Sequence, residues 1–224
     1  MNTDQWGHFY REICLDLGID PESDFRSAQL LESIVGEKSD AELIEKYRGN
    51  AFYVIGNGTN LTEALPLIGD GTTIVADSAV KTFMGTGRTP DLVVTDLDGG
   101  ITSLRQAYRK GATMIVHAHG DNQERIVKYA KEFSGRMVGT TQNKPLEHIF
   151  NFFGFTDGDR GAYLADYLHA GEIYLVGFDF SIAVSKKNTD PERKLKKLKW
   201  AKILLEELAM ERGKTLENGP LIPL

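Results

Sequence analysis

Short apolar runs rich in Val and Ile recur along the chain from residue 51, and they constrain its fold more than any other feature. Nearly continuous apolar runs of this length are typical of strands that are buried on both faces of a parallel sheet. The amphipathic stretches between the runs supply the helical crossovers that such a sheet requires. We therefore predict an α/β fold with a doubly wound, mostly parallel sheet, whose strands lie at residues 52–55, 72–76, 92–95, 114–117, 136–139 and 173–176.

Helices are predicted on either side of this strand-rich part of the chain. Residues 4–48 carry apolar side chains at helical spacing, so we expect three helices that form an N-terminal helical cap. A stripe of leucines that begins at Leu195 predicts one long amphipathic helix over residues 191–212. Residues 147–153 suit either an edge strand or a buried helical turn, and we favour the strand.

Length and composition bound the domain organisation and the class of partner. A chain of 224 residues suits an N-terminal helical region at 1–49 and one α/β domain at 50–224. A net charge of −6, from 26 Lys and Arg against 32 Asp and Glu, argues against a broad nucleic-acid surface. The single cysteine, Cys14, excludes an intrachain disulfide and a cysteine-rich zinc cage. Without an apolar stretch of roughly 18 residues or a signal-like start, we expect no membrane partner and a cytoplasmic location.

Closely spaced aspartates follow the strand predicted at 92–95 and the strand after it. Asp96 and Asp98 lie one residue apart, and Asp121 follows the next strand. Ligands of open α/β sheets bind at the carboxyl ends of the strands, and a hard cation such as Mg²⁺ would relieve the repulsion between neighbouring carboxylates. We therefore predict that these three acids hold Mg²⁺ at a nucleotide site; the alternative is a solvated acidic turn.

Two other strand ends carry side chains suited to a ligand. Glycines after the strand at 52–55 permit close approach of backbone N–H groups to a phosphate, although a simple strand-to-helix turn needs the same glycines. Asp and Ser after the strand at 72–76 suit ligand contacts and are equally common as helix caps. The candidate binding residues at these two ends are Gly56, Asn57, Gly58, Asn60, Asp77 and Ser78.

Two histidines and a later acidic stretch leave alternatives open. His117 and His119 lie two residues apart, as in a zinc pair, but a third nearby His or Cys is missing and we favour ligand contacts or turn hydrogen bonds. Asp157, Asp159 and Arg160 surround a predicted helix start. Such a start can bind an anion, with Arg160 neutralising a transferred phosphate, or it can hold a surface cap made by Asp159 and Arg160.

The last predicted strand ends in Asp179, with an aromatic residue on either side. These aromatic rings could stack on a flat heterocycle or close the core. The lysines at 186–199 could form a phosphate-binding face. Because the leucine stripe explains their spacing, we favour a solvated helix face for most of them.

Several of these motifs resemble those of known families. Residues 90–98, which read PDLVVTDLD, resemble the signature of thiamine pyrophosphokinases, and the ADSA turn at 76–79 is similar to their second-strand motif. The order of motifs, from the N-terminal helices to Asp179, is more similar to the archaeal 6-hydroxymethyl-7,8-dihydropterin pyrophosphokinase family. The chain departs from the thiamine enzymes at Gly99, where they favour serine, and at 117–121, where they are more acidic.

The resemblance implies an ATP-dependent diphosphotransferase of pterin biosynthesis. It implies Mg²⁺-dependent transfer of diphosphate from ATP to 6-hydroxymethyl-7,8-dihydropterin, with AMP released. Nucleotide-sugar glycosyltransferases, which also use an Asp-x-Asp metal site, and a non-catalytic nucleotide-binding module are the alternatives. A homodimer is expected because symmetric pairs are common. The implied catalytic residues are Asp96, Asp98, Asp121 and Arg160, and the implied nucleotide or substrate contacts are Gly56, Asn57, Gly58, Asn60, Asp77, Ser78, His119 and Asp179.

Overall fold

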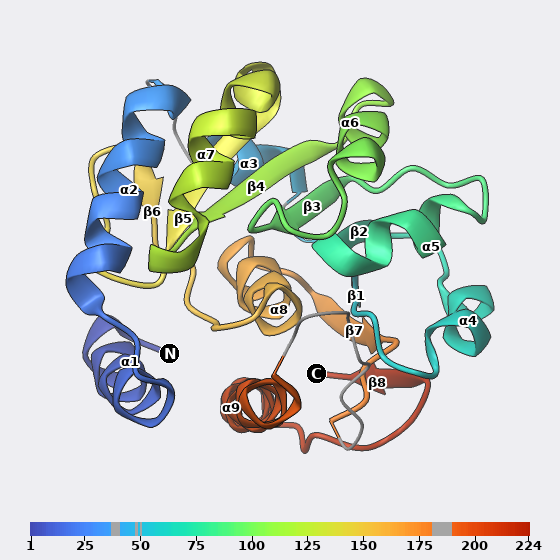
Figure 1. Cartoon of the computed structure of the whole chain (residues 1–224). Helices are drawn as coiled ribbons and strands as arrows, with labels where there is room; N and C mark the ends of the chain where they lie inside the picture. The colour runs from blue at the N-terminus through green and yellow to red at the C-terminus, as the bar shows by residue number, and fades with distance from the viewer. Residues whose placement is uncertain (37–40, 48, 50, 181–189) are drawn as a thin grey trace.

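A single sheet forms the centre of the protein (Figure 1). The computed structural model describes residues 1–36, 41–47, 49, 51–180 and 190–224. Within these ranges the strands are β1 (Ala51–Ile55), β2 (Thr72–Ala76), β3 (Leu92–Thr95), β4 (Thr113–Ala118), β5 (Met137–Thr141), β6 (Ile149–Phe150), β7 (Glu172–Val176) and β8 (Leu221–Pro223). Their order is β6-β5-β4-β3-β2-β1-β7-β8, and β8 alone among them pairs antiparallel. The predicted α/β fold is confirmed.

The predicted strands match the observed ones to within two residues at each end, with two qualifications. The ambiguous segment at 147–153 contributes a strand as favoured, but β6 is only two residues long. The sequence did not predict β8, because its three residues end in Pro223 and carry no periodic signal. This strand exists because Ile222 pairs with Leu175 of β7, which is a tertiary contact.

Helices lie on both sides of the sheet (Figure 1). Asn2 caps the first helix and Asp20 caps the second, which explains where both begin. The three predicted N-terminal helices and the long C-terminal helix are confirmed. Leu195, where the leucine stripe begins, is 47% exposed. The helices are α1 (Thr3–Leu17), α2 (Pro21–Val35), α3 (Ala41–Tyr47), α4 (Leu61–Ala64), α5 (Val80–Met84), α6 (Ile101–Arg109), α7 (Gln123–Tyr129), α8 (Asp157–Tyr167) and α9 (Pro191–Glu211).

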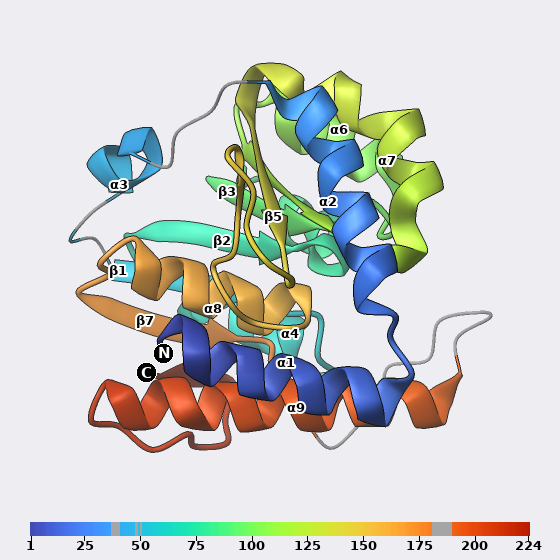
Figure 2. The same ribbon diagram turned by 90° about the vertical axis from the view of Figure 1, so that its left-hand side faces the viewer.

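The strands send alternate side chains into two separate cores. Val54 of β1 packs in the core under α8 and α9, whereas Ile55 packs in the core under the helices of the other face. On the first face α8 contacts β1, β2 and β3, α9 covers α8, and α1 runs alongside α9 (Figure 2). On the second face α2 packs across β4 and β5, and α5 packs on β2. None of the helices in the described ranges combines the length and apolarity needed to cross a bilayer.

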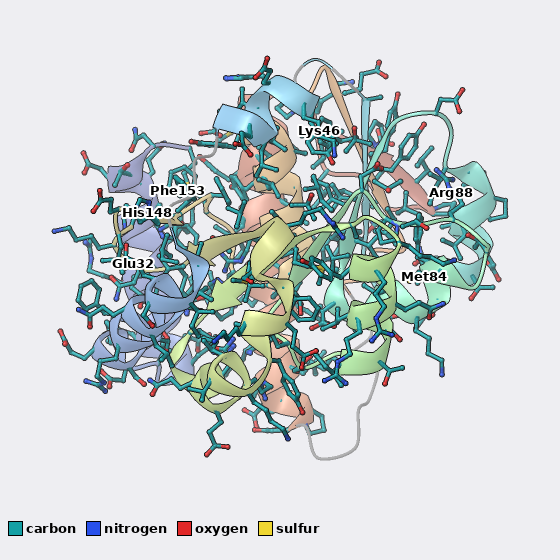
Figure 3. The ribbon with its side chains drawn as sticks, turned by 90° about the horizontal axis from the view of Figure 1, so that it is seen from above. Glu32, Lys46, Met84, Arg88, His148 and Phe153 are labelled. Carbon is teal, nitrogen blue, oxygen red and sulfur yellow. The ribbon has the colours of Figure 1, made fainter. Side chains whose placement is uncertain are left out.

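The helix α2 is joined to the connection between β5 and β6. The backbone N–H of His148 donates a hydrogen bond to Glu32 Oε1 over 3.0 Å. Figure 3 shows Glu32, His148 and Phe153 gathered on one side of the molecule, opposite Met84 and Arg88. The N-terminal helices are thus attached to the sheet by polar contacts as well as by apolar packing.

We predict that α2 unfolds together with the sheet. Leu31 is fully buried against β5, so Leu31→Ala should lower the free energy of unfolding by about 2–5 kcal/mol. Leu15→Ala is the matched control, because Leu15 is 79% exposed and should change it by less than about 0.5 kcal/mol. Urea unfolding followed by circular dichroism measures both. A small loss for Leu31→Ala, or a separate early transition of the N-terminal helices, would contradict this prediction.

Candidate active site

Three carboxylates meet at the edge of the sheet where the parallel strands end. Asp77 directly follows β2, Asp96 directly follows β3, and Asp157 is the first residue of α8. One oxygen of each lies within 4.8 Å of an oxygen of the other two, and among the described residues these three acids form the candidate metal group. We call them the acidic cluster.

The first member, Asp77, is buried. Its Oδ2 accepts a hydrogen bond of 2.5 Å from Thr95 Oγ1 and one of 3.1 Å from the N–H of Asp98. Its Oδ1 is also buried and has no hydrogen-bond partner among the described groups. Burial, reinforced by the negative charge of Asp96, raises the pKa of Asp77 to about 6. A buried carboxylate with a raised pKa and one unpartnered oxygen is suited to a cation, which would favour its ionised form.

The turn after β3 is shaped around Asp77. Leu97 adopts a left-handed conformation with φ 69°, and its N–H donates to Thr95 Oγ1 over 2.8 Å. A Cβ at position 99 would lie 1.9 Å from Asp77 Oδ1, so a side chain there would displace the carboxylate. This contact gives the physical reason why the chain has Gly99 at the position where thiamine pyrophosphokinases favour serine.

The second member, Asp96, is held ionised by its neighbours. His119 Nδ1 accepts the N–H of Asp121, so the ring proton is assigned to Nε2, which donates to Asp96 Oδ2 over 3.2 Å. Arg125 Nη2 lies 3.9 Å from the same oxygen. Burial acts to raise the pKa of Asp96, but the hydrogen bond from His119 and the charge of Arg125 outweigh it and lower the pKa to about 2. His119 therefore orients and stabilises a carboxylate of the cluster.

The third member, Asp157, starts α8 above the ends of β1, β2 and β3. Burial and the charges of Asp96 and Asp77 raise its pKa well above the ordinary value. Asp159 is a buried helix cap, because it accepts the N–H groups of Phe155 and Thr156 at 2.6 and 2.8 Å. The sequence had placed Asp157 at a helix start but had not predicted that it meets the other two acids.

Arg160 lies in the core beneath the acidic cluster. Its side chain is fully buried and donates to the carbonyl oxygens of Phe153 and Phe155 and to His117 Nε2, at 3.1 to 3.4 Å. Burial lowers the pKa of Arg160 to about 10, so the guanidinium stays charged at neutral pH. A direct contact with phosphate would require these bonds to break. In its observed position Arg160 offsets the negative charge of the cluster from below.

The two histidines that resemble a zinc pair have separate partners. Because His117 Nε2 accepts from Arg160, its ring is neutral, and burial lowers the pKa of His117 well below the ordinary value. His119 stacks on His117 with ring centroids 5.6 Å apart but bonds to Asp96. The structure thus shows hydrogen bonds of both histidines within the protein, and contacts with a ligand stay a prediction.

Two cavities lie on either side of Asp157. The first cavity, of about 360 Å³, lies between the α1–α2 turn, the ends of β3 and β4 and the start of α8, and Asp96 borders it. The second cavity, of about 240 Å³, lies beside the loops after β1, β2 and β7. Thr156, Asp157 and Lys197 border both cavities. Asp157 thus lies between the two cavities, Asp96 borders the first, and the neighbours of Asp77 in the chain, Ala76 and Ser78, border the second.

The glycine-rich loop after β1 packs closely against the loop after β7. The N–H of Gly56 donates to Val176 O over 2.9 Å, and that of Gly58 donates to Gly177 O over 2.7 Å. A Cβ at Gly58 would lie 2.7 Å from that same carbonyl oxygen. The close contact between the loops explains both glycines, and these two N–H groups are already used within the protein.

The other predicted contacts occupy different places around the second cavity. Asn57, Ser78 and Asp179 border it, and Asp179 also accepts a hydrogen bond from Thr59 Oγ1. The Asn60 amide donates to the backbone carbonyls of residues 178 and 219 at 3.3 to 3.4 Å. Of the predicted basic face, Lys194 and Lys197 border the cavity, whereas Lys186 and Lys187 lie outside the described residues.

The predicted trio of metal-binding acids is only partly brought together. Asp96 belongs to the acidic cluster, but Asp98 and Asp121 lie on the wall of the first cavity. The side chain of Asp121 is 76% exposed and lies 4.0 Å from Arg193. Asp98 is also exposed, although its N–H supports Asp77. The geometry therefore favours Asp77 and Asp157 as the partners of Asp96.

Acids at the carboxyl ends of parallel strands, next to two cavities, are the arrangement expected of an α/β protein that binds its ligands at this edge of the sheet. Residues 27–185 match a family model described as 6-hydroxymethylpterin diphosphokinase MptE-like. The chain therefore belongs to this family. It is 44% identical to a 6-hydroxymethyl-7,8-dihydropterin pyrophosphokinase of Pyrococcus furiosus, over 97% of this chain and 99% of the relative. Enzymes of the same name from Methanocaldococcus jannaschii and Methanothermobacter thermautotrophicus are each 34% identical over 93% of this chain and 96% and 95% of their own.

We predict that Gly99→Ala disrupts the acidic cluster. The added methyl group would overlap Asp77 Oδ1, so the free energy of unfolding should fall by about 1–3 kcal/mol. Gly219→Ala is the control, because its nearest neighbour would lie at 3.8 Å. Equilibrium unfolding in urea measures both, and equal stabilities would show that Asp77 moves aside freely.

The raised pKa of Asp77 predicts a pH-dependent stability of the metal-free protein. Folding raises this pKa from 3.8 to about 6, so the folded state binds more protons, and this contribution is present below pH 4 and lost as the pH rises through 6. Asp77→Asn should therefore gain stability relative to the wild type between pH 4 and 7, on the order of 1–3 kcal/mol. Urea unfolding in the presence of a chelator measures this difference. A difference that is the same at pH 4 and pH 7 would contradict it.

Proposed function

We propose that the protein transfers diphosphate from ATP to the hydroxymethyl oxygen of 6-hydroxymethyl-7,8-dihydropterin and releases AMP, as a step of methanopterin-type pterin biosynthesis. The names of the three relatives support this reaction. The observation that carries it in the structure is the acidic cluster next to two cavities. A reaction between a nucleotide and a heterocyclic alcohol needs two such spaces that meet where phosphorus is transferred.

The acidic cluster is proposed to hold Mg²⁺. Three carboxylates offer the hard oxygen ligands that Mg²⁺ prefers, and the buried, unpartnered Oδ1 of Asp77 fits a metal ligand. Bound there, Mg²⁺ would neutralise charge on the phosphate oxygens during transfer. His119 keeps Asp96 oriented and ionised, and Arg160 offsets the charge of the cluster from the core.

The second cavity is proposed to take ATP. Phe178 and Phe180 border it and are proposed to stack on the base, and Lys194 and Lys197 add positive charge for phosphates. Lys197 also borders the first cavity, so a phosphate chain in its reach would run toward the cluster. Asn57 and Ser78 are proposed as polar contacts of the nucleotide.

The first cavity is then left for the acceptor alcohol. Attack by its oxygen on the β-phosphorus of ATP forms the new P–O bond and breaks the bond to AMP, and the hydroxyl proton is released. Asp98 borders this cavity and is proposed to orient that hydroxyl. In this scheme the protein contributes mainly position and electrostatic stabilisation, as is general for phosphoryl transfer.

The reaction itself is tested by incubating the purified protein with ATP, Mg²⁺ and the reduced hydroxymethylpterin. Phosphorus NMR should show AMP and a pterin diphosphate in equal amounts. Parallel incubations with nucleotide sugars examine the glycosyltransferase alternative. Turnover of a nucleotide sugar alone, or ATP binding without consumption of the pterin, would reject the proposal.

Single substitutions should decide which acids hold the metal. Asp77→Asn, Asp96→Asn and Asp157→Asn should each lower turnover by at least about 100-fold, the scale of losing a main electrostatic stabiliser. Asp121→Asn should cost less than about tenfold, because its side chain lies exposed outside the cluster.

Asp4→Asn is the control for these variants, because Asp4 is an exposed residue of α1. Steady-state kinetics at saturating ATP measures all five proteins. The opposite pattern, with Asp121→Asn severely impaired and Asp157→Asn near normal, would assign the metal to the trio predicted from the sequence.

A further inference from the structure

A buried carboxylate outside the acidic cluster borders the first cavity. Asp24 of α2 is only 1% exposed, yet its side chain forms part of the cavity wall. Its Oδ1 accepts the N–H of Gly120 over 2.7 Å, and its Oδ2 accepts Tyr10 Oη at 2.7 Å and Gln142 Nε2 at 2.6 Å. No Lys, Arg or His in the described ranges forms an ion pair with Asp24.

Arg160 interacts electrostatically with Asp24, but its hydrogen bonds go to Phe153, Phe155 and His117. A buried carboxylate without an ion-pair partner is costly, and neutral side chains could tie α1, α2 and the end of β5 together at lower cost. A carboxylate has about four acceptor positions. Protein donors use three of them on Asp24, which leaves one on Oδ1.

The cavity beside Asp24 has walls suited to a flat polar ring. Ile19 from the α1–α2 turn and Phe155 before α8 supply apolar surface, and the volume of about 360 Å³ is in the range of small-molecule sites. Asp96 and Asp157 border the same cavity. A ring that contacts Asp24 with one edge would therefore lie in the same cavity as Asp96 and Asp157.

We propose that Asp24 reads the amino-pyrimidinone edge of the pterin, accepting a hydrogen bond from the 2-amino group through its remaining position on Oδ1. The hydroxymethyl group, on the opposite side of the ring, is then directed to the acidic cluster. This inference rests on the proposed function and adds the residue that selects the acceptor. It also gives the N-terminal helices a role, because α2 supplies Asp24 and α1 supplies the Tyr10 that positions it.

The test compares two acceptors that differ at the edge of the ring that Asp24 should recognise. 6-Hydroxymethyl-7,8-dihydrolumazine carries a 2-oxo group in place of the 2-amino group of the pterin, and its neighbouring ring nitrogen N1 carries a proton. The wild-type protein should prefer the pterin in kcat/KM by about 10- to 100-fold, the scale of one hydrogen bond to a charged group. In Asp24→Asn this preference should fall to about threefold or less, with the KM for ATP changed by less than about twofold.

Tyr10→Phe is the matched control, because it removes one donor to Asp24 and keeps the carboxylate. It should retain the preference for the pterin even if it lowers stability. Equal losses for both acceptors in Asp24→Asn would show that Asp24 is only a structural residue and would overturn the inference. A wild-type protein that shows no preference between the two acceptors would also overturn the inference. This comparison uses the wild type alone, so it does not depend on whether a variant folds.

A binding measurement separates this inference from the proposed reaction. Isothermal titration of the oxidised 6-hydroxymethylpterin, without ATP, should show binding to the wild type that weakens by at least about tenfold in Asp24→Asn. If no pterin diphosphate forms but this difference holds, the proposed function fails and the inference stands. If the diphosphate forms but affinity is unchanged in Asp24→Asn, the inference fails and the function stands.

Discussion

Mutual repulsion of three carboxylates at one edge of the sheet is the constraint on which the rest of the site depends. Asp77, Asp96 and Asp157 lie too close together to be ionised at low cost in a buried place. The shifts of pKa follow from this conflict: Asp96 is kept ionised by His119 and Arg125, while the pKa values of the other two rise. A cation resolves the conflict, and we therefore interpret the cluster as a functional site and not as a stabilising one.

The fold supplies the cluster from three parts of the chain and then encloses it. The sheet brings the ends of β2 and β3 together, and α8 returns from the sheet edge to place Asp157 above them. The absent side chain of Gly99 makes room for Asp77. The loops after β1 and β7 border one adjoining cavity, and the N-terminal helices border the other. In the proposed reaction each substrate would reach the cluster from its own cavity.

The sequence predicted what depends on local patterns and failed where distant segments meet. The apolar runs located six strands, because strands buried on both faces are nearly continuous in Val and Ile. Asp96 was identified because it directly follows one of these runs. Asp157 was missed as a cluster member because only the crossover of α8 brings it to β2 and β3. Asp121 was predicted to bind the metal with Asp96 and Asp98 because it follows a strand, but its side chain is 76% exposed.

The central claim is that Asp77, Asp96 and Asp157 share one divalent cation. A crystal soaked in Mn²⁺, measured near the absorption edge of manganese, tests this claim most directly through the anomalous difference map. The account predicts one strong peak among the carboxylate oxygens of these three residues, reached directly or through a bound water. A peak held by Asp98 and Asp121, with Asp77 and Asp157 turned away from it, would contradict the account.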